Sequence, residues 1–214
     1  MTMAAPDYAA RLQIEYPEQL DRMTTFFRLI WIIPIGIIVA ILTSSGSGTA
    51  WTESGDTVRT TGMGISGSLG VVTALMILFR QRYPRWWFDF ALELARFSMR
   101  IGAYGALLTD RYPSTEEQQS VHLDVDYPNV DQDLNRWLPL VKWLLAIPHY
   151  IVLFFLAIAA FVVVVIAWFA ILFTGRYPEG MFTFVVGVFR WGLRVQAYAF
   201  LLVTDRYPPF SLDR

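Results

Sequence analysis

The sequence has no cysteine and only two histidines, His122 and His149, among its 214 residues. The missing cysteines exclude disulfides, thiol catalysis and cysteine-ligated metal sites. Charge is also scarce: 16% of the residues are charged, whereas a soluble domain carries about 25%. The net charge of −1 gives no electrostatic reason to expect nucleic acid as a partner. Since 55% of the residues are hydrophobic, we expect a small integral membrane protein.

Three apolar stretches carry this expectation. Phe26–Leu42 contains a single charge, Arg28, placed to snorkel to the interface. Gly64–Phe79 is shorter and uncharged, and the Ser/Gly-rich segment before it predicts a loop. The third stretch runs from Trp137 to Thr174, nearly twice the about 20 residues of one crossing. It therefore predicts two spans with a turn near Leu156–Ala160.

Several motifs occur twice along the chain, which predicts two copies of one unit. RFSMRIGAYGALLTDRYP at 96–113 recurs as RWGLRVQAYAFLLVTDRYP at 190–208, and LFRQRYP at 78–84 as LFTGRYP at 172–178. The units are placed at residues 8–113 and 119–209, with spans at about 25–42, 64–80, 137–156 and 159–174 and interfacial helices at about 85–109 and 179–204. The expected fold class is an all-α integral membrane fold with two parallel internal repeats, each a short N-terminal strand, a two-span helical hairpin and an amphipathic interfacial helix. The chain would then have four transmembrane helices in total.

Each expected strand is an alternation of apolar and polar residues, at Leu12–Glu15 and Val121–Asp126. Tyr-Pro pairs divide the units, because the residue before proline avoids the helical region and tyrosine suits the headgroup level. They predict helix stops at the membrane surface, with a peptide-recognition motif as the alternative. These stops are Tyr83-Pro84, Tyr112-Pro113, Tyr177-Pro178 and Tyr207-Pro208.

Two arginine pairs are the candidate contact residues. Arg96 and Arg100, and likewise Arg190 and Arg194, lie one helical turn apart, and their guanidinium groups could bind lipid phosphates or a partner. The alternative is ordinary snorkelling, with Glu93 pairing to an arginine. With two spans per unit, every Lys and Arg except Arg59 lies on the side of the N-terminus, which predicts cytoplasmic N- and C-termini.

The other titratable groups have structural explanations. Asp110 and Asp205 follow the last apolar turn of each unit, where pairing at the helix end is the main interpretation and ion coupling the alternative. His149 could ligate a haem or chlorophyll, but no second histidine lies in an expected span, so a structural role is favoured. No phosphate loop, nucleophile elbow or metal spacing occurs. The sequence thus nominates no catalytic residue, no metal ligand and no cofactor.

Ile147-Pro148-His149, Phe173-Thr174-Gly175-Arg176-Tyr177-Pro178 and Thr204–Phe210 resemble a bacterial membrane-protein family known as domain of unknown function 4389. The first half departs from this pattern, with Gln81 at the place of Gly175 and the long Ser/Gly loop. The resemblance implies a bacterial multi-pass membrane protein in the inner membrane and no particular activity.

The function expected from these observations is non-enzymatic. The chain would be a multi-pass membrane scaffold or accessory subunit of a larger bacterial membrane complex, with arginine-bearing interfacial helices on the cytoplasmic leaflet. A small transporter or a lipid-binding protein is the alternative. The expected partners are membrane lipids and another membrane protein or a second copy of the chain, and not nucleic acid.

Overall fold

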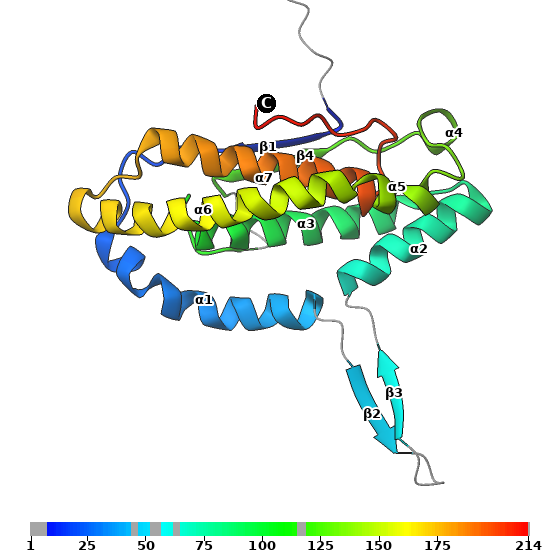
Figure 1. Ribbon diagram of the computed structural model, residues 1–214, viewed down its shortest axis with the longest axis horizontal. Coiled ribbons are helices and arrows are strands. Elements are labelled where there is room, and N and C mark those ends of the chain that lie inside the picture. Colours follow the sequence, from blue (N-terminus) through cyan, green and yellow to red (C-terminus); the bar gives the residue numbers. More distant parts are fainter. Residues whose placement is uncertain (1–7, 44–46, 52–56, 62–64, 115–118, 214) are drawn as a thin grey trace, which may run out of the picture.

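The computed structural model describes residues 8–43, 47–51, 57–61, 65–114 and 119–213. In chain order the elements are β1 (Ala10–Ile14), α1 (Arg22–Thr43), β2 (Ser47–Trp51), β3 (Thr57–Thr61), α2 (Ile65–Arg80), α3 (Arg85–Gly105), β4 (Val121–Val125), α4 (Val130–Asp133), α5 (Pro139–Leu145), α6 (Ile147–Thr174) and α7 (Glu179–Ala199). They build three layers (Figure 1). The sheet β1–β4 covers the middle layer, α3 and α7, which pack against α1, α5 and α6 of the outer layer; α2 joins this outer layer through contacts with α1 and α5.

The sheet forms where the alternation of residues places strands, and it joins the two halves of the chain. β1 pairs antiparallel with β4, so that Leu12 lies opposite Leu123 and Gln13 opposite His122. Because side chains alternate between the two faces of a strand, Leu12 and Leu123 are buried while Gln13 and His122 are exposed. The two expected strands are therefore present, and they pair with each other.

The expected four-span fold with two repeats is wrong. Among the described residues, one helix alone, α6, is long and apolar enough to cross a membrane, so neither a multi-pass protein nor two equivalent units is supported. The turn expected at Leu156–Ala160 is absent, because α6 is continuous over 28 residues. The break lies earlier, at Ala146, where α5 ends and Pro148 occupies the first turn of α6, a position that suits proline.

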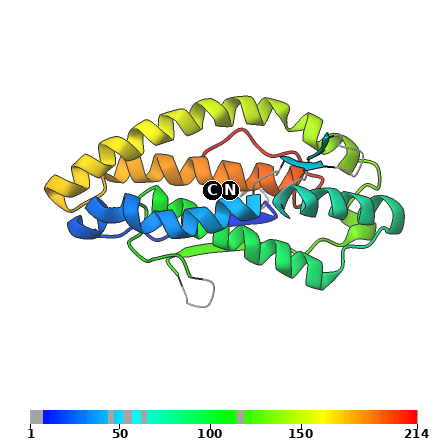
Figure 2. The same ribbon diagram turned by 90° about the horizontal axis from the view of Figure 1, so that it is seen from below.

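The third helix of each half is not an interfacial helix resting on a leaflet. α7 lies between the sheet and α6 (Figures 1 and 2), and eleven of its 21 residues are buried. α3 has the same relation to β4 and α1. One arginine of the polar stripe on each helix faces the sheet, since Arg96 and Arg190 donate to carbonyl groups of β4 and β1.

The Ser/Gly-rich segment also differs from the expected loop. Ser47–Trp51 and Thr57–Thr61 pair as the antiparallel hairpin β2–β3, with Ser47 opposite Thr61. Threonine, valine and tryptophan favour strands, although polar residues on both sides hide any alternation. The hairpin projects away from the three layers (Figure 1), and it separates α1 from α2 where the second half has the uninterrupted α6.

Candidate functional site

Large apolar side chains are exposed along the helices of the outer layer. We call the exposed side of α1, α2, α5 and α6 the apolar face. On α6 only His149, Ala160, Ala167 and Ile171 are buried, which leaves most of a 28-residue apolar helix uncovered. Exposed examples from the four helices are Ile30, Phe79, Trp143, Phe161 and Phe173. Patches of more than a few hundred Å² are unusual on a soluble monomer and mark an interaction surface.

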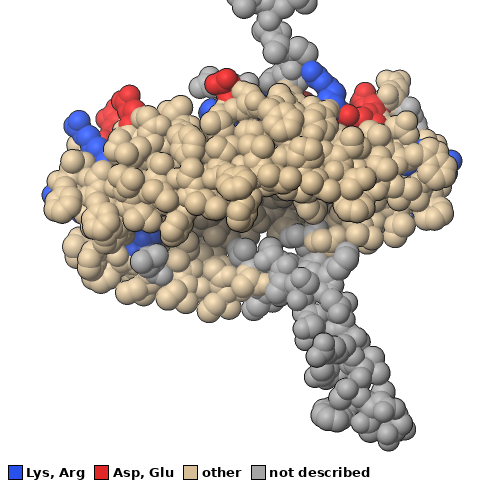
Figure 3. Space-filling model, in the orientation of Figure 1, with Lys and Arg blue, Asp and Glu red and all other residues tan. Residues whose placement is uncertain are grey.

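The opposite side of the molecule is polar. The outward residues Gln13 and Asp124 of the sheet are exposed, as is Glu15 directly after β1, and Arg11 pairs with Asp126 at 2.6 Å. In Figure 3 the charged side chains gather along the edge that carries the sheet and near the two ends, and the described surface below them is almost uncharged. The layers therefore separate charge from apolar surface.

Hydrogen bonds show that the sheet runs along the helices and not across them. Near the start of β1, the Tyr8 hydroxyl donates to the Arg194 carbonyl at 3.4 Å. After the strand, the Tyr16 hydroxyl donates to the Tyr177 carbonyl at 2.5 Å, just before α7 begins. α6 lies beside α7 in turn, since Trp191 Nε1 donates to His149 Nδ1 at 3.0 Å. The polar sheet thus extends beside much of α7 and in the same direction as α6 (Figure 1).

The four predicted contact arginines donate to the sheet, to the connection between α3 and β4, and to the C-terminal tail. Arg96 donates through Nε to the Leu123 carbonyl at 2.9 Å, and Arg190 to the Leu12 carbonyl at 3.0 Å. Arg100 donates to the Ser114 carbonyl, and Arg194 to the Ser211 carbonyl. Arg96 also pairs with Glu93 at 2.6 Å. Each arginine therefore binds its own chain, and contact with a lipid or a partner stays a prediction.

The Tyr-Pro positions divide into buried and exposed tyrosines. Pro84 and Pro178 stand directly before α3 and α7, while Tyr83 and Tyr177 are 3% and 0% exposed. Burial raises the pKa of both hydroxyls, for Tyr83 to about 12. Their carbonyls accept hydrogen bonds from Tyr127 and Tyr16 respectively. Tyr112 and Tyr207, before Pro113 and Pro208, are about half exposed.

Two long-range ion pairs replace the local pairing expected for the aspartates. Arg28, expected to snorkel, is instead buried, pairs with Asp110 and donates to the Tyr104 and Thr109 carbonyls. Lys142 is buried as well; its Nζ lies 2.7 Å from Asp205 Oδ1 and donates to the Thr204 carbonyl at 2.8 Å. Both cations belong to helices of the outer layer, α1 and α5, whereas the aspartates follow α3 and α7, the helices beneath the sheet. The two ion pairs therefore hold these two layers together.

His149 has a structural position. Its Nδ1 accepts from Trp191, and its ring stacks on Phe210 with centroids 4.0 Å apart. Within the described segments, no group of three His, Cys, Asp or Glu residues is placed to hold a metal ion.

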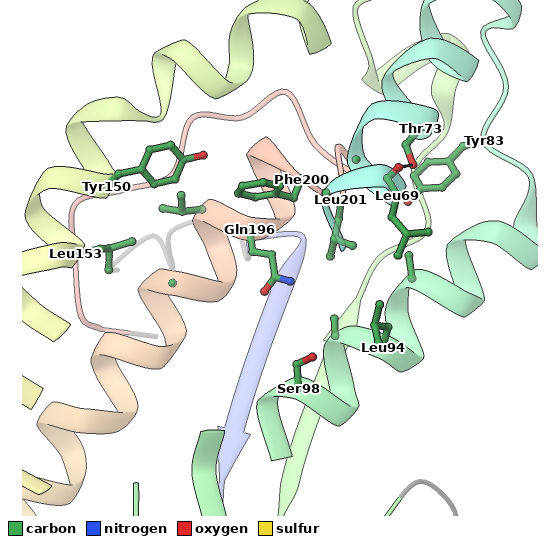
Figure 4. Close-up of a pocket in the computed structure, with 16 residues that line it drawn as sticks. Leu69, Thr73, Tyr83, Leu94, Ser98, Tyr150, Leu153, Gln196, Phe200 and Leu201 are labelled. Atoms are coloured by element: carbon green, nitrogen blue, oxygen red, sulfur yellow. Dashed lines mark hydrogen bonds between the residues drawn. The ribbon is translucent and has the colours of Figure 1, made fainter. Parts of the chain in front are cut away.

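A cavity of about 410 Å³ lies between α2, α3, α6 and α7, and we call it the inner cavity (Figure 4). Its volume falls in the range of about 300–1,000 Å³ typical of ligand sites. The wall is mainly apolar, and Tyr150, Ser98 and Gln196 add polar groups from α6, α3 and α7. The sequence analysis missed these residues, although polar side chains within apolar helical runs were an available signal.

The comparison with protein-family models identifies part of the chain. Residues 137–211 match the family model described as Domain of unknown function (DUF4389). This segment contains α5, α6 and α7, and hence the end of the chain that carries Lys142, Asp205 and part of the inner cavity. No curated protein and no solved structure matches the chain.

Proposed function

We propose that this chain, whose residues 137–211 belong to the DUF4389 family, is a non-enzymatic scaffold or accessory subunit seated in one leaflet of the bacterial cell membrane. The apolar face would enter the hydrocarbon, and the sheet would face the cytoplasm. There the sheet side would bind another membrane protein or a second copy of the chain.

One observation supports this orientation in the membrane: the polar sheet runs parallel to the apolar helices. α6 is long enough to cross a bilayer, but if it stood upright, β1 and β4 would enter the hydrocarbon beside α7. Exposed groups such as Glu15 and Asp124 would then lose their water, at a cost of several kcal/mol for each ionised group. With the helices in the plane of the membrane, the apolar face is in lipid and the sheet stays in water.

The lack of native cysteine makes the orientation directly testable. Gln132 and Arg176 are exposed near opposite ends of the α5–α6 segment, so Gln132→Cys and Arg176→Cys would each carry a single thiol. A membrane-impermeant maleimide should label both variants in inside-out vesicles and neither in intact cells. Labelling of the two positions from opposite sides would mean that α6 crosses the membrane, and the in-plane seating would be wrong.

A charge placed in the apolar face should weaken membrane binding. Phe161 is 70% exposed in the middle of α6, and lysine at the centre of an apolar helix costs about 2.5–3.5 kcal/mol on the insertion scale. We expect Phe161→Lys to reduce co-flotation of the full chain with phosphatidylcholine vesicles at least tenfold. Gln13→Lys, on the sheet, is the control and should float like the wild type. Equal flotation of both variants would contradict the proposal.

The scaffold role can be tested by identifying the proteins that are extracted together with the chain. Native mass spectrometry of the gently extracted chain should reveal a stoichiometric protein partner or a second copy. Recovery of the monomer alone, after extraction that preserves other membrane complexes, would argue against this role and leave only the membrane seating.

Lipid binding is the second candidate, and the inner cavity favours it. The cavity lies between the helices that carry the apolar face and the helices beneath them, and its polar groups are few. A site of this kind suits a ligand that is itself dissolved in the membrane.

A further inference from the structure

A second hollow adjoins the inner cavity on the side of the apolar face. It measures about 290 Å³, lies between α2, α5 and the end of α7, and shares Gly67, Gly70 and Phe200 with the inner cavity. Its other walls include Leu75 and Trp143, which are exposed on the apolar face. The two glycines add no side-chain bulk where the hollows meet, so Phe200 is the largest of the shared residues.

The inner cavity selects against charge. None of its described lining residues is acidic, basic or a histidine, so an ionised ligand would lose its hydration without a counter-charge. The polar groups are neutral: they are the Gln196 amide and the hydroxyls of Tyr150, Ser98, Thr73 and Tyr83. In Figure 4, Tyr150 and Gln196 extend from α6 and α7 into the space between the helices, with Ser98 on the α3 side.

The Tyr150 hydroxyl is available to bind a polar group of a ligand. It is buried and has no hydrogen-bond partner among the described residues, as is also true of the Tyr83 hydroxyl on the α2 side of the cavity. A buried hydroxyl without a partner is unfavourable by about 1–3 kcal/mol, which a ligand oxygen at the same place would recover. The site thus combines a mainly apolar wall, neutral hydrogen-bonding groups and a neighbouring hollow at the apolar face.

We propose that the inner cavity binds an uncharged, single-chain amphiphile, such as a long-chain alcohol, that enters from the membrane past Phe200. This inference rests on the proposed seating, because the neighbouring hollow then faces hydrocarbon. The chain of the ligand occupies the apolar wall and the neighbouring hollow. Its hydroxyl group bonds to Tyr150, Gln196 or Ser98.

Two glycines of α7 give a matched pair of variants. A Cβ added at Gly192 or at Gly180 meets no atom within 4 Å, so a side chain can be introduced at either position without a clash at its first carbon. Gly192 lines the inner cavity, whereas Gly180 is exposed at the start of α7. Gly192→Leu therefore fills the cavity, and Gly180→Leu introduces the same side chain on the same helix outside it.

The experiment is a titration of the full chain in detergent with 1-hexadecanol, read by native mass spectrometry. We expect wild type and Gly180→Leu to bind one molecule alike, and Gly192→Leu to bind at least tenfold more weakly. Tyr150→Phe should weaken binding about two- to tenfold, the worth of one hydrogen bond. Palmitate at pH 9 should bind at least tenfold more weakly than the alcohol. No binding by the wild type, undiminished binding by Gly192→Leu, or equal binding of palmitate would overturn the proposal.

Vesicle flotation separates this inference from the proposed function. Gly192→Leu should float with phosphatidylcholine vesicles as the wild type does, because its new side chain is internal. Normal flotation without the expected hexadecanol pattern refutes the ligand site alone. Selective hexadecanol binding by a chain that does not float refutes the membrane seating.

Discussion

Replacing Asp205 with asparagine should leave a buried ammonium group without its counter-charge. Lys142 is 0% exposed, and its Nζ lies 2.7 Å from Asp205 Oδ1. Burial lowers the pKa of Lys142 below its ordinary value of 10.5, and Asp205 opposes that shift. Asparagine keeps the size of the side chain and can still accept the hydrogen bond that the backbone N–H of Asn135 donates. The substitution therefore removes the charge and little else.

The expected loss follows from this burial. Breaking a buried ion pair by removing one partner costs about 3–5 kcal/mol. The Thr204 carbonyl still accepts a hydrogen bond from Lys142, so we expect a loss near the lower end, about 3 kcal/mol. With a urea slope of about 2 kcal/mol per M, the unfolding midpoint would fall by about 1.5 M.

The dependence of this loss on pH identifies its cause. The unpaired Lys142 has a lowered pKa, so at pH values below 10.5 the unfolded chain binds more protons than the folded one, and stability rises with pH. The loss caused by Asp205→Asn should therefore shrink between pH 7 and pH 9.5. Asp110→Asn is the matched control, because it leaves Arg28, 3% exposed, and a guanidinium stays charged over this range. Its loss should not shrink.

Urea unfolding of the full chain in mild detergent, followed by tryptophan fluorescence at both pH values, measures these changes. A loss below about 1 kcal/mol for Asp205→Asn, well under the range for a buried pair, would refute the reasoning. So would an equal response to pH in the two variants, because only the lysine can lose its proton.

Three smaller effects should also be measurable. Gln81 has a left-handed φ of 45° after α2, where Gly175 has 72° after α6. The left-handed conformation costs a residue with a side chain about 1–2 kcal/mol, whereas glycine costs about 0.5–1 kcal/mol in conformational entropy. Gln81→Gly should therefore raise the free energy of unfolding by about 0.5–1 kcal/mol, and a lower thermal midpoint would contradict this. Burial raises the pKa of Tyr83 to about 12. Between pH 10 and 12 the unfolded chain loses this proton while the folded chain keeps it, so the free energy of unfolding falls by about 2–3 kcal/mol. Tyr83→Phe should remove that part of the fall in a urea series, and unchanged slopes would exclude Tyr83 as its source. Tyr127→Phe loses the hydrogen bond to the Tyr83 carbonyl and should cost about 1 kcal/mol in urea titrations at pH 7. Tyr112 is similarly exposed, but its hydroxyl makes no hydrogen bond to the described residues, so Tyr112→Phe should change little; equal losses would contradict the assignment.

Local patterns predicted the strands but not their partners. The alternation around Leu12 and Leu123 has the period of a strand, and it depends only on neighbouring residues. The pairing of these two residues joins distant parts of the chain, which no local pattern reports. The same limit applies to Asp110 and Asp205, which were expected to pair near their own helix ends and instead bind Arg28 and Lys142.

The number of crossings was wrong for a different reason. Hydropathy tells whether a segment prefers apolar surroundings, but not the direction in which it lies. Phe26–Leu42 is apolar enough for lipid, yet it lies along the molecule with one side on α3 and α6. The inner cavity was missed because it exists only where four helices meet, and single polar residues such as Gln196 have many structural explanations.

The pairing of β1 with β4 delays formation of the sheet until late in the synthesis of the chain. About a hundred residues separate the two strands, so at about 5–20 residues per second the ribosome needs about 5–20 s to supply the second strand after the first. Throughout that interval β1 has no strand partner, while α1, with its apolar side, has already been synthesised. A nascent chain delivered to the membrane could keep α1 in lipid during the wait. We therefore expect membrane delivery during synthesis to protect the chain from aggregation before its sheet can close.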